Sequence, residues 1–273
     1  MSDAIAVSHG DFGRAALYRL NKPIVMHAHR EGHLIFHLQG PDAQINVGGR
    51  MHRLCSTQGI AVSPWQAHSF NLTAANDPVL CLVLYIKPIW FLETSETADQ
   101  GLSFGDATLA MTPQITRRVR LLTSLLMDEE HPAVFDRYLY ETTLASFDET
   151  WAGHLDGCTI DPGRFTDFRV RRSLRLMQQR FTEGIEMEAL ARDAGLSRPH
   201  FFTLFKRQMG ITPNVYLNTL RTEQAIQDLV TTSKSVTDIS YELGFSSQAS
   251  FTRFFASNVG IPPSEYRRVG HQA

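Results

Sequence analysis

The stretch MEALARDAGLSRPHFFTLF occupies residues 187–205, and VTDISYELGFSSQASFTRF, which follows the same pattern, occupies residues 236–254. Each stretch predicts a short helix, a turn, and a second helix rich in aromatic residues. Gly195 and Gly244 supply the positive φ that a sharp turn between helices requires, and Ser197 and Ser246 are expected to cap the second helices. Because a second helix presented in this way enters the major groove of DNA, the pattern predicts two helix-turn-helix units.

The other residues of the C-terminal third of the chain also fit a duplicated unit. The spacing that separates Gly195 from Gly244 also separates Phe202 from Phe251. From Asp167 onward we expect helices, with an apolar stripe near residues 170–181 and a longer helix over residues 213–230 that joins the two units. Duplication of one structural unit explains this periodicity.

Charge is divided unevenly along the chain. The 273 residues carry a net charge of −2, and 43% of them are hydrophobic, as in a globular protein of about two domains. Residues 169–273 hold 14 Lys and Arg against 9 Asp and Glu, whereas residues 1–168 hold 12 against 19. A basic C-terminal third beside an acidic remainder indicates that one domain faces phosphates.

No apolar run is long enough to cross a bilayer, and no signal peptide is recognised at the N-terminus, so we expect a cytoplasmic protein with no membrane partner. Cys55, Cys81 and Cys158 have no spacing typical of metal or disulfide sites and are expected to be reduced thiols.

The first part of the chain is rich in short strand signals separated by turns. Runs at residues 13–20, 33–38, 43–47, 59–62 and 79–86 predict an antiparallel barrel or sandwich. Two helices follow, with apolar stripes near residues 115–126 and 138–147; they pack on the β-domain or form part of a dimer interface. The predicted fold is therefore α+β, with a β-barrel near residues 1–95, appended helices near 113–151, a first domain ending at 152, a linker over 153–167 and an all-α domain over 168–273.

Residues 169–268 resemble the AraC/XylS family of bacterial transcription regulators. The resemblance rests on DISYELGFSSQ at residues 238–248, followed by Phe251 and Phe254, and on GIPPSEYR at residues 260–267. It implies that a stiff helix holds two recognition helices so that they enter successive major grooves of promoter DNA. It also implies a small-molecule effector, activation through contact with RNA polymerase, and no enzyme activity. A homodimer is plausible.

Candidate DNA contacts lie on the two second helices. Gln pairs bidentately with adenine and Arg with guanine, so polar side chains here predict base reading; a solvated helix face is the alternative. In the first unit, the positions that the family uses fall near Pro199, Phe202 and Thr203. The side chains of the first two cannot hydrogen-bond to bases, so other polar residues of this helix take a base-reading or merely positional role. The candidates are Arg198, His200, Thr203, Ser247, Gln248, Ser250 and Arg253, with Lys206 and Arg207 as phosphate contacts.

Histidines gather in the β-rich part, in HAHREGH at residues 27–33 and GIAVSPWQAHSFN at residues 59–71. These stretches resemble the two cupin motifs, which implies a cupin-like sensing barrel. His27 and His29 share one face of a strand. A site of His27, His29, His33 and His68 would suit zinc, iron, nickel or copper. The histidines alternatively line an organic-effector pocket together with Trp65, or only form structural hydrogen bonds.

The sequence favours a regulator in which an effector bound by His27, His29, His33, Trp65 and His68 controls DNA binding, with no cofactor and no metal. A metal-dependent cupin enzyme or metal sensor fused to a DNA-binding domain is the alternative. A regulator controlled by a protein partner through the barrel or the appended helices is a third hypothesis; a pocket filled by side chains would favour it.

Overall fold

The computed structural model describes residues 2–73, 77–94, 102–128, 132–152 and 167–272. The expected linker over 153–167 lies outside the described residues except for Asp167, whose side chain caps α4 by accepting a hydrogen bond from the backbone of Arg169. No helix in the described ranges combines the length and apolar character needed to cross a membrane.

The described strands form two sheets, and all of these strands except β11 belong to the N-terminal domain. The larger follows the order β10-β7-β4-β9-β2-β1-β11 and the smaller the order β3-β8-β5-β6. All pairs within them are antiparallel except β1 with β11, which is parallel. The strands are β1 (Asp3–Gly10), β2 (Gly13–Leu20), β3 (Ile24–His27), β4 (Gly32–Gln39), β5 (Ala43–Val47), β6 (Arg50–Leu54), β7 (Gln58–Val62), β8 (His68–Leu72), β9 (Val79–Ile86), β10 (Thr108–Ala110) and β11 (Gly270–Gln272).

Alternating side chains of the larger sheet serve two cores. Along β2, Ala16 and Tyr18 belong to the core shared with the smaller sheet, whereas Ala15 and Leu17 belong to the core shared with the helices. The helices of this domain are α1 (Pro88–Thr94), α2 (Pro113–Met127) and α3 (Pro132–Trp151). Ile115 of α2 and Leu139 of α3 are buried in that second core, which confirms that the apolar stripes pack on the β-domain.

Of the expected barrel or sandwich, the described strands form two separate sheets, as in a sandwich, and they do not close into a barrel. Closure requires hydrogen-bonded neighbours all around, and β3 and β6 remain the edges of the smaller sheet. Strand runs identify segments that are extended, but they do not determine which segments pair. The expected strands at 13–20, 43–47 and 79–86 share their bounds with β2, β5 and β9.

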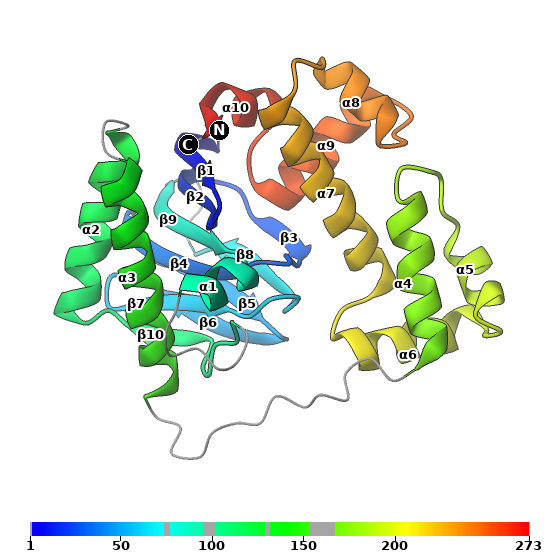
Figure 1. Ribbon diagram of the computed structural model, residues 1–273, viewed down its shortest axis with the longest axis horizontal. Helices are drawn as coiled ribbons and strands as arrows, with labels where there is room; N and C mark the ends of the chain where they lie inside the picture. Colours follow the sequence, from blue (N-terminus) through cyan, green and yellow to red (C-terminus); the bar gives the residue numbers. More distant parts are fainter. Residues whose placement is uncertain (1, 74–76, 95–101, 129–131, 153–166, 273) are drawn as a thin grey trace.

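The C-terminal domain is helical, and α7 runs between its two units (Figure 1). The first unit lies at one end of α7 and the second at the other. The helices are α4 (Phe168–Arg180), α5 (Met187–Asp193), α6 (Arg198–Met209), α7 (Pro213–Thr231), α8 (Val236–Glu242), α9 (Gln248–Val259) and α10 (Pro263–Val269).

Turn chemistry explains where these helices begin and end. Gly195 and Gly244 have φ of 67° and 78°, as the sequence predicts. Ser197 is the N-cap residue of α6, but its side chain makes no cap hydrogen bond. The cap of α9 is Ser247, whose hydroxyl accepts a hydrogen bond from the Ser250 backbone, so the expectation of Ser246 was wrong by one residue.

Candidate DNA-binding face and histidine cluster

The second helix of the first unit, α6, presents the candidate DNA contacts of this unit on the surface. Arg198, His200, Thr203, Lys206 and Arg207 are all exposed. The Arg198 guanidinium pairs with Glu188 at 2.6 Å and lies over the Phe202 ring. The Thr203 hydroxyl donates to the Pro199 carbonyl of its own helix at 3.0 Å. The hydrogen bond of Thr203 to its own helix reduces its freedom to reach bases, whereas the exposed ion pair of Arg198 with Glu188 is weak.

The four candidate DNA contacts on the second helix of the second unit, at Ser247 and in α9, are of two kinds. Ser247 and Ser250 are half-buried and bonded to each other at 3.0 Å, so they serve the helix cap. Gln248 and Arg253 are exposed. The Gln248 Oε1 accepts a hydrogen bond from Thr237 at 3.0 Å, which holds the amide near the start of α9. Gln248 and Arg253 are therefore the stronger candidates for reading bases.

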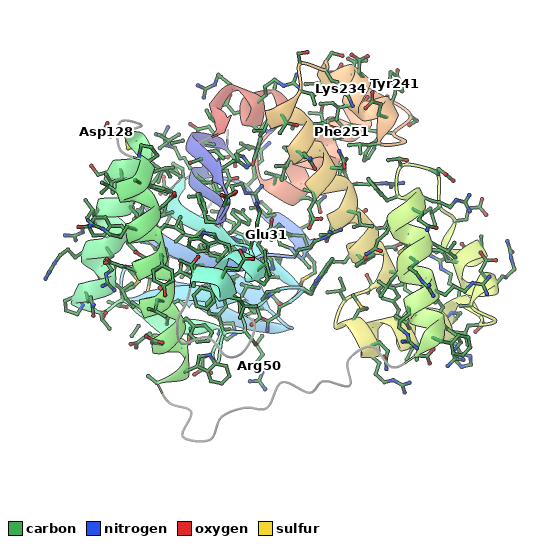
Figure 2. The ribbon with its side chains drawn as sticks, viewed as in Figure 1. Glu31, Arg50, Asp128, Lys234, Tyr241 and Phe251 are labelled. Atoms are coloured by element: carbon green, nitrogen blue, oxygen red, sulfur yellow. The ribbon has the colours of Figure 1, made fainter. Side chains whose placement is uncertain are left out.

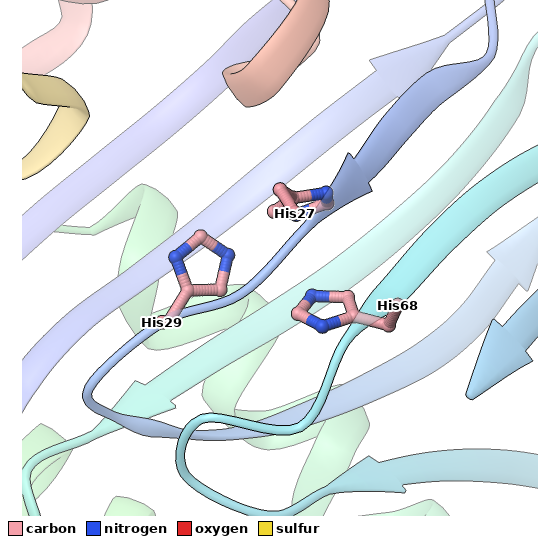
Figure 3. A group of neighbouring side chains, drawn as sticks. All are labelled: His27, His29 and His68. Atoms are coloured by element: carbon pink, nitrogen blue, oxygen red, sulfur yellow. The ribbon is translucent and has the colours of Figure 1, made fainter. Parts of the chain in front are cut away.

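In the β-domain, the four candidate histidines come together. His27 ends β3, His29 lies in the loop after it, His33 is in β4, and His68 begins β8 directly opposite His27. All four side chains are buried. The ring centroids of His27 and His68 are 4.2 Å apart, and those of His29 and His68 are 5.2 Å apart. Figure 3 shows His27, His29 and His68 around one common space.

Backbone carbonyls determine which nitrogens of these rings carry hydrogen. The Nδ1 of His27 lies 2.6 Å from the Val25 carbonyl, and the Nδ1 of His68 lies 2.9 Å from the Gln66 carbonyl. Because a carbonyl oxygen only accepts, both Nδ1 atoms are protonated and both Nε2 atoms present lone pairs. His33 then donates from Nδ1 to the Nε2 of His68 at 3.1 Å. Among the described residues, the buried Nε2 atoms of His29 and His33 have no hydrogen-bond partner.

The histidine cluster is uncharged at neutral pH. Burial lowers the pKa of His27 from 6.5 to about 4. Burial, reinforced by the neighbouring imidazoles, lowers the pKa of His29, His33 and His68 well below 6.5. At neutral pH these rings therefore do not gain a second N–H that could donate to a neighbour.

The space beside the cluster is small. A cavity of about 30 Å³, lined by His27, His33, His68, Ile45 and Phe70 among others, has room for about one water molecule. The fifth expected effector residue, Trp65, faces elsewhere: its ring stacks on Tyr216 of α7 at 5.1 Å. Trp65 thus joins the contact between the two domains.

A much larger space lies between the β-domain and α7. This cleft has a volume of about 800 Å³ and is lined from the β-domain by Arg14, His29, Glu31 and Lys87, and from α7 by Glu223, among others. Glu31 faces the region between the domains (Figure 2). The sequence offered no signal for this cleft, because its walls come from segments about 200 residues apart.

Arg14 anchors the second unit to the β-domain. Its buried guanidinium lies 3.6 Å from the centre of the Tyr85 ring and donates to the Tyr266 hydroxyl of α10 at 3.1 Å. The same hydroxyl lies 3.0 Å from the Nε2 of His9. Burial, with the charges of Arg14 and Lys87, lowers the pKa of His9 to about 3, so this imidazole is neutral and accepts from Tyr266.

Glu223 of α7 is the second charged contact between the domains. Its carboxylate pairs with Arg30 at 2.9 Å. Burial, together with the charge of Glu31, outweighs the attraction of Arg30 and raises the pKa of Glu223 from 4.5 to about 7. Native Glu223 therefore binds its proton more tightly than Glu223 in the unfolded chain, and its contribution to stability falls as pH rises from about 4.5 to 7.

Replacing Glu223 with Gln will therefore stabilise the protein at pH 8 and leave its stability nearly unchanged at pH 4. The gain at pH 8 is at most about 3.5 kcal/mol, because each unit of pKa shift corresponds to about 1.4 kcal/mol. Urea unfolding at both pH values measures it. The control is Glu242→Gln, at an exposed carboxylate of α8. A gain of equal size at both pH values would contradict this assignment.

Comparison with known proteins identifies the C-terminal domain. Residues 190–269 match the family model described as a helix-turn-helix domain. The probable transcriptional regulator LumQ of Photobacterium leiognathi is 24% identical over 91% of this chain and 94% of its own length. The lactose operon transcription activator of Staphylococcus xylosus is 25% identical over 65% of this chain and 62% of its own length.

Solved structures share the whole architecture. An apo form of ToxT from Vibrio cholerae aligns with 96% of this chain and 98% of its own, with a TM-score of 0.61 and 14% identity. Wild-type ToxT with an unsaturated fatty acid bound aligns with 98% of this chain and 95% of its own, with a TM-score of 0.56 and 13% identity. At these identities the similarity establishes the fold.

The chain is a transcriptional regulator with an AraC-type helix-turn-helix DNA-binding domain, and DNA is its partner. That the relatives are regulators confirms the expectation of a regulator rather than an enzyme.

Proposed function

We propose that the chain binds promoter DNA sequence-specifically through α6 and α9, and that an effector bound to the N-terminal domain controls this binding. The observation that carries the proposal is the contact of one β-domain with both ends of α7. Ala28 belongs to the core of the first unit, while Tyr18 shares a core with Phe251 and Phe255 of the second. A ligand that favours one position of the β-domain therefore shifts the relative placement of the recognition helices.

The cleft between the β-domain and α7 is our proposed site for an organic effector. Its volume lies in the range of small-molecule sites, and His29 is the expected effector residue on its wall. The cleft is lined by charged side chains of both signs, so it suits a polar molecule with charged groups; these side chains are Arg14, Arg30, Lys87, Asp11, Glu31, Asp136 and Glu223. The fatty acid bound to ToxT supports effector control in this architecture, and the lactose operon activator supports activation. Contact with RNA polymerase and a homodimer remain part of this proposal.

Replacing Gln248 or Arg253 with Ala will relax the sequence preference of DNA binding. Each bidentate contact to a base contributes about 1–3 kcal/mol of discrimination, so each variant loses about 5-fold to 150-fold in preference for its base pair. Selection of bound duplexes from a randomised library, followed by affinity measurement on the selected site, gives both the site and the loss.

The matched control is Lys206→Ala on α6. As a phosphate contact, Lys206 contributes to binding of every sequence, so its loss weakens binding uniformly and reduces the salt dependence. If the Gln248 and Arg253 variants select the wild-type site with unchanged affinity, α9 does not read bases and the proposal fails.

A further inference from the structure

The histidine cluster places lone pairs against one another inside a core. The Nε2 atoms of His27 and His68 carry no hydrogen, because each ring donates from Nδ1 to a carbonyl. One ligand nitrogen from each of His27, His29 and His68 lies within 4.8 Å of the others. The Nε2 of His68 accepts a hydrogen bond from His33, whereas the buried Nε2 of His29 has no hydrogen-bond partner among the described residues. An unpartnered buried ring nitrogen beside the lone pairs of His27 and His68 favours a bound cation.

We propose that His27, His29 and His68 bind a divalent transition-metal ion, and that its binding is transmitted to α7. Three neutral imidazoles suit zinc, copper, nickel or iron. The two carbonyl contacts hold the rings as the outer contacts of metal-binding histidines usually do.

The space and the distances fit an ion better than an organic molecule. The adjoining cavity of about 30 Å³ is far below the size of a small-molecule site. Zinc binds imidazole nitrogen at about 2.0–2.1 Å, so neighbouring tetrahedral ligands are about 3.3 Å apart. The three ligand nitrogens lie within 4.8 Å of one another, so a movement of about 1.5 Å toward each other brings them to this distance.

His33 holds one of the proposed ligands, His68. Its Nδ1–H donates to the Nε2 of His68 at 3.1 Å, and its ring stacks on Tyr85. An ion that takes the lone pair of His68 displaces this hydrogen bond. His33 therefore competes with the metal ion for the lone pair of His68. Three histidine ligands leave a fourth coordination position for water or an anion.

The route to α7 starts between two of the ligands. Ala28 separates His27 from His29, and its carbonyl accepts a hydrogen bond from the Thr219 hydroxyl of α7 at 2.9 Å. The His29 carbonyl accepts from the backbone N–H of Trp65 at 2.7 Å, and the Trp65 ring stacks on Tyr216. Drawing His27 and His29 toward one ion therefore moves backbone that is bonded to α7. This part of the inference rests on the proposed function.

The site is tested first without DNA. The full chain, freed of metal by a chelator, is titrated with Zn²⁺ by calorimetry and with Co²⁺ by visible absorption. We expect one ion per chain and a loss of affinity of about 100-fold or more in His68→Ala and in His29→Gln, since even outer-contact losses cost about 10-fold to 100-fold. His52→Ala, at a half-buried histidine of β6, is the control and retains the wild-type affinity.

Circular dichroism of the metal-free variants establishes that they are folded, and His29→Gln preserves side-chain volume if His68→Ala is unfolded. Absence of stoichiometric binding by the wild-type chain overturns the site. Equal binding by wild type, His29→Gln and His68→Ala also overturns it, since the ions then bind elsewhere on the surface.

Transmission to α7 is tested with DNA selected from the randomised library. We expect Zn²⁺ to change the affinity of the wild-type chain at least about 5-fold, the lower end of typical coupling between sites. Thr219→Val retains metal binding but loses this change. If Zn²⁺ binds but alters no DNA affinity, the transmission is wrong and the site stands. If Zn²⁺ does not bind while α9 still reads bases, the site fails and the proposed function stands.

Discussion

Replacing Gly244 with Ala will destabilise the second helix-turn-helix unit by more than about 3 kcal/mol. Gly244 has φ of 78°, a conformation that costs an L-residue about 1–2 kcal/mol. A Cβ at this position would also meet the Thr182 carbonyl oxygen at 2.1 Å. Because that oxygen is backbone, relief requires the segment after α4 to move away from the turn. The turn between α8 and α9 therefore has no room for any side chain.

The matched control is Gly195→Ala in the first unit. Gly195 has φ of 67°, and a Cβ there would meet nothing within 4 Å. Only the conformational cost remains, so we expect a loss of about 1–2 kcal/mol. Urea unfolding followed by circular dichroism compares the two variants. Equal losses would show that the Thr182 contact is not what makes Gly244 essential.

Replacing Tyr266 with Ala will cost about 4 kcal/mol or more and loosen the contact between the second unit and the β-domain. The Tyr266 side chain is fully buried and packs against Phe255 with ring centroids 5.6 Å apart. Its removal leaves a cavity and takes a partner from the buried guanidinium of Arg14. Truncation of a buried aromatic ring costs about 3–5 kcal/mol, and loss of the hydrogen bond adds to it.

Tyr266→Phe separates these two contributions. It keeps the ring and removes only the hydroxyl that bridges Arg14 and His9, so we expect a loss of about 1–3 kcal/mol. Tyr241→Ala, at a tyrosine that is 60% exposed on α8 (Figure 2), is the control and should change stability by less than about 0.5 kcal/mol. Thermal unfolding of the full chain measures all three. A neutral Tyr266→Phe would contradict the role assigned to the bridge.

The sequence predicted the helix-turn-helix units because their signals are local. A glycine at positive φ, a cap residue and a helical apolar period act within one turn of chain, and Gly195 and Gly244 have the expected conformation. The cap of α9 was misplaced by one residue because Ser246 and Ser247 are chemically equivalent and only the geometry distinguishes them. Strand runs were found for the same local reason.

What the sequence did not reveal depends on contacts between distant segments. The carbonyl of Ala28 meets the hydroxyl of Thr219, and Arg14 meets Tyr266, without any local pattern that marks these residues as partners. The sequence predicted which histidines gather in the cluster, but it did not predict that Trp65 stacks on Tyr216. The polar strand β6 has no regular alternation of apolar and polar residues, so no strand was predicted there.

The parallel pairing of β11 with β1 has a consequence for solubility. Val7 pairs with Gly270 and His9 with Gln272, so the DNA-binding domain itself covers the outer edge of β1. Any motion that carries α10 away from the β-domain breaks this pairing and leaves an open strand edge, a template for pairing with another chain. Freedom of the DNA-binding domain and protection against edge-to-edge association are therefore opposed in this protein.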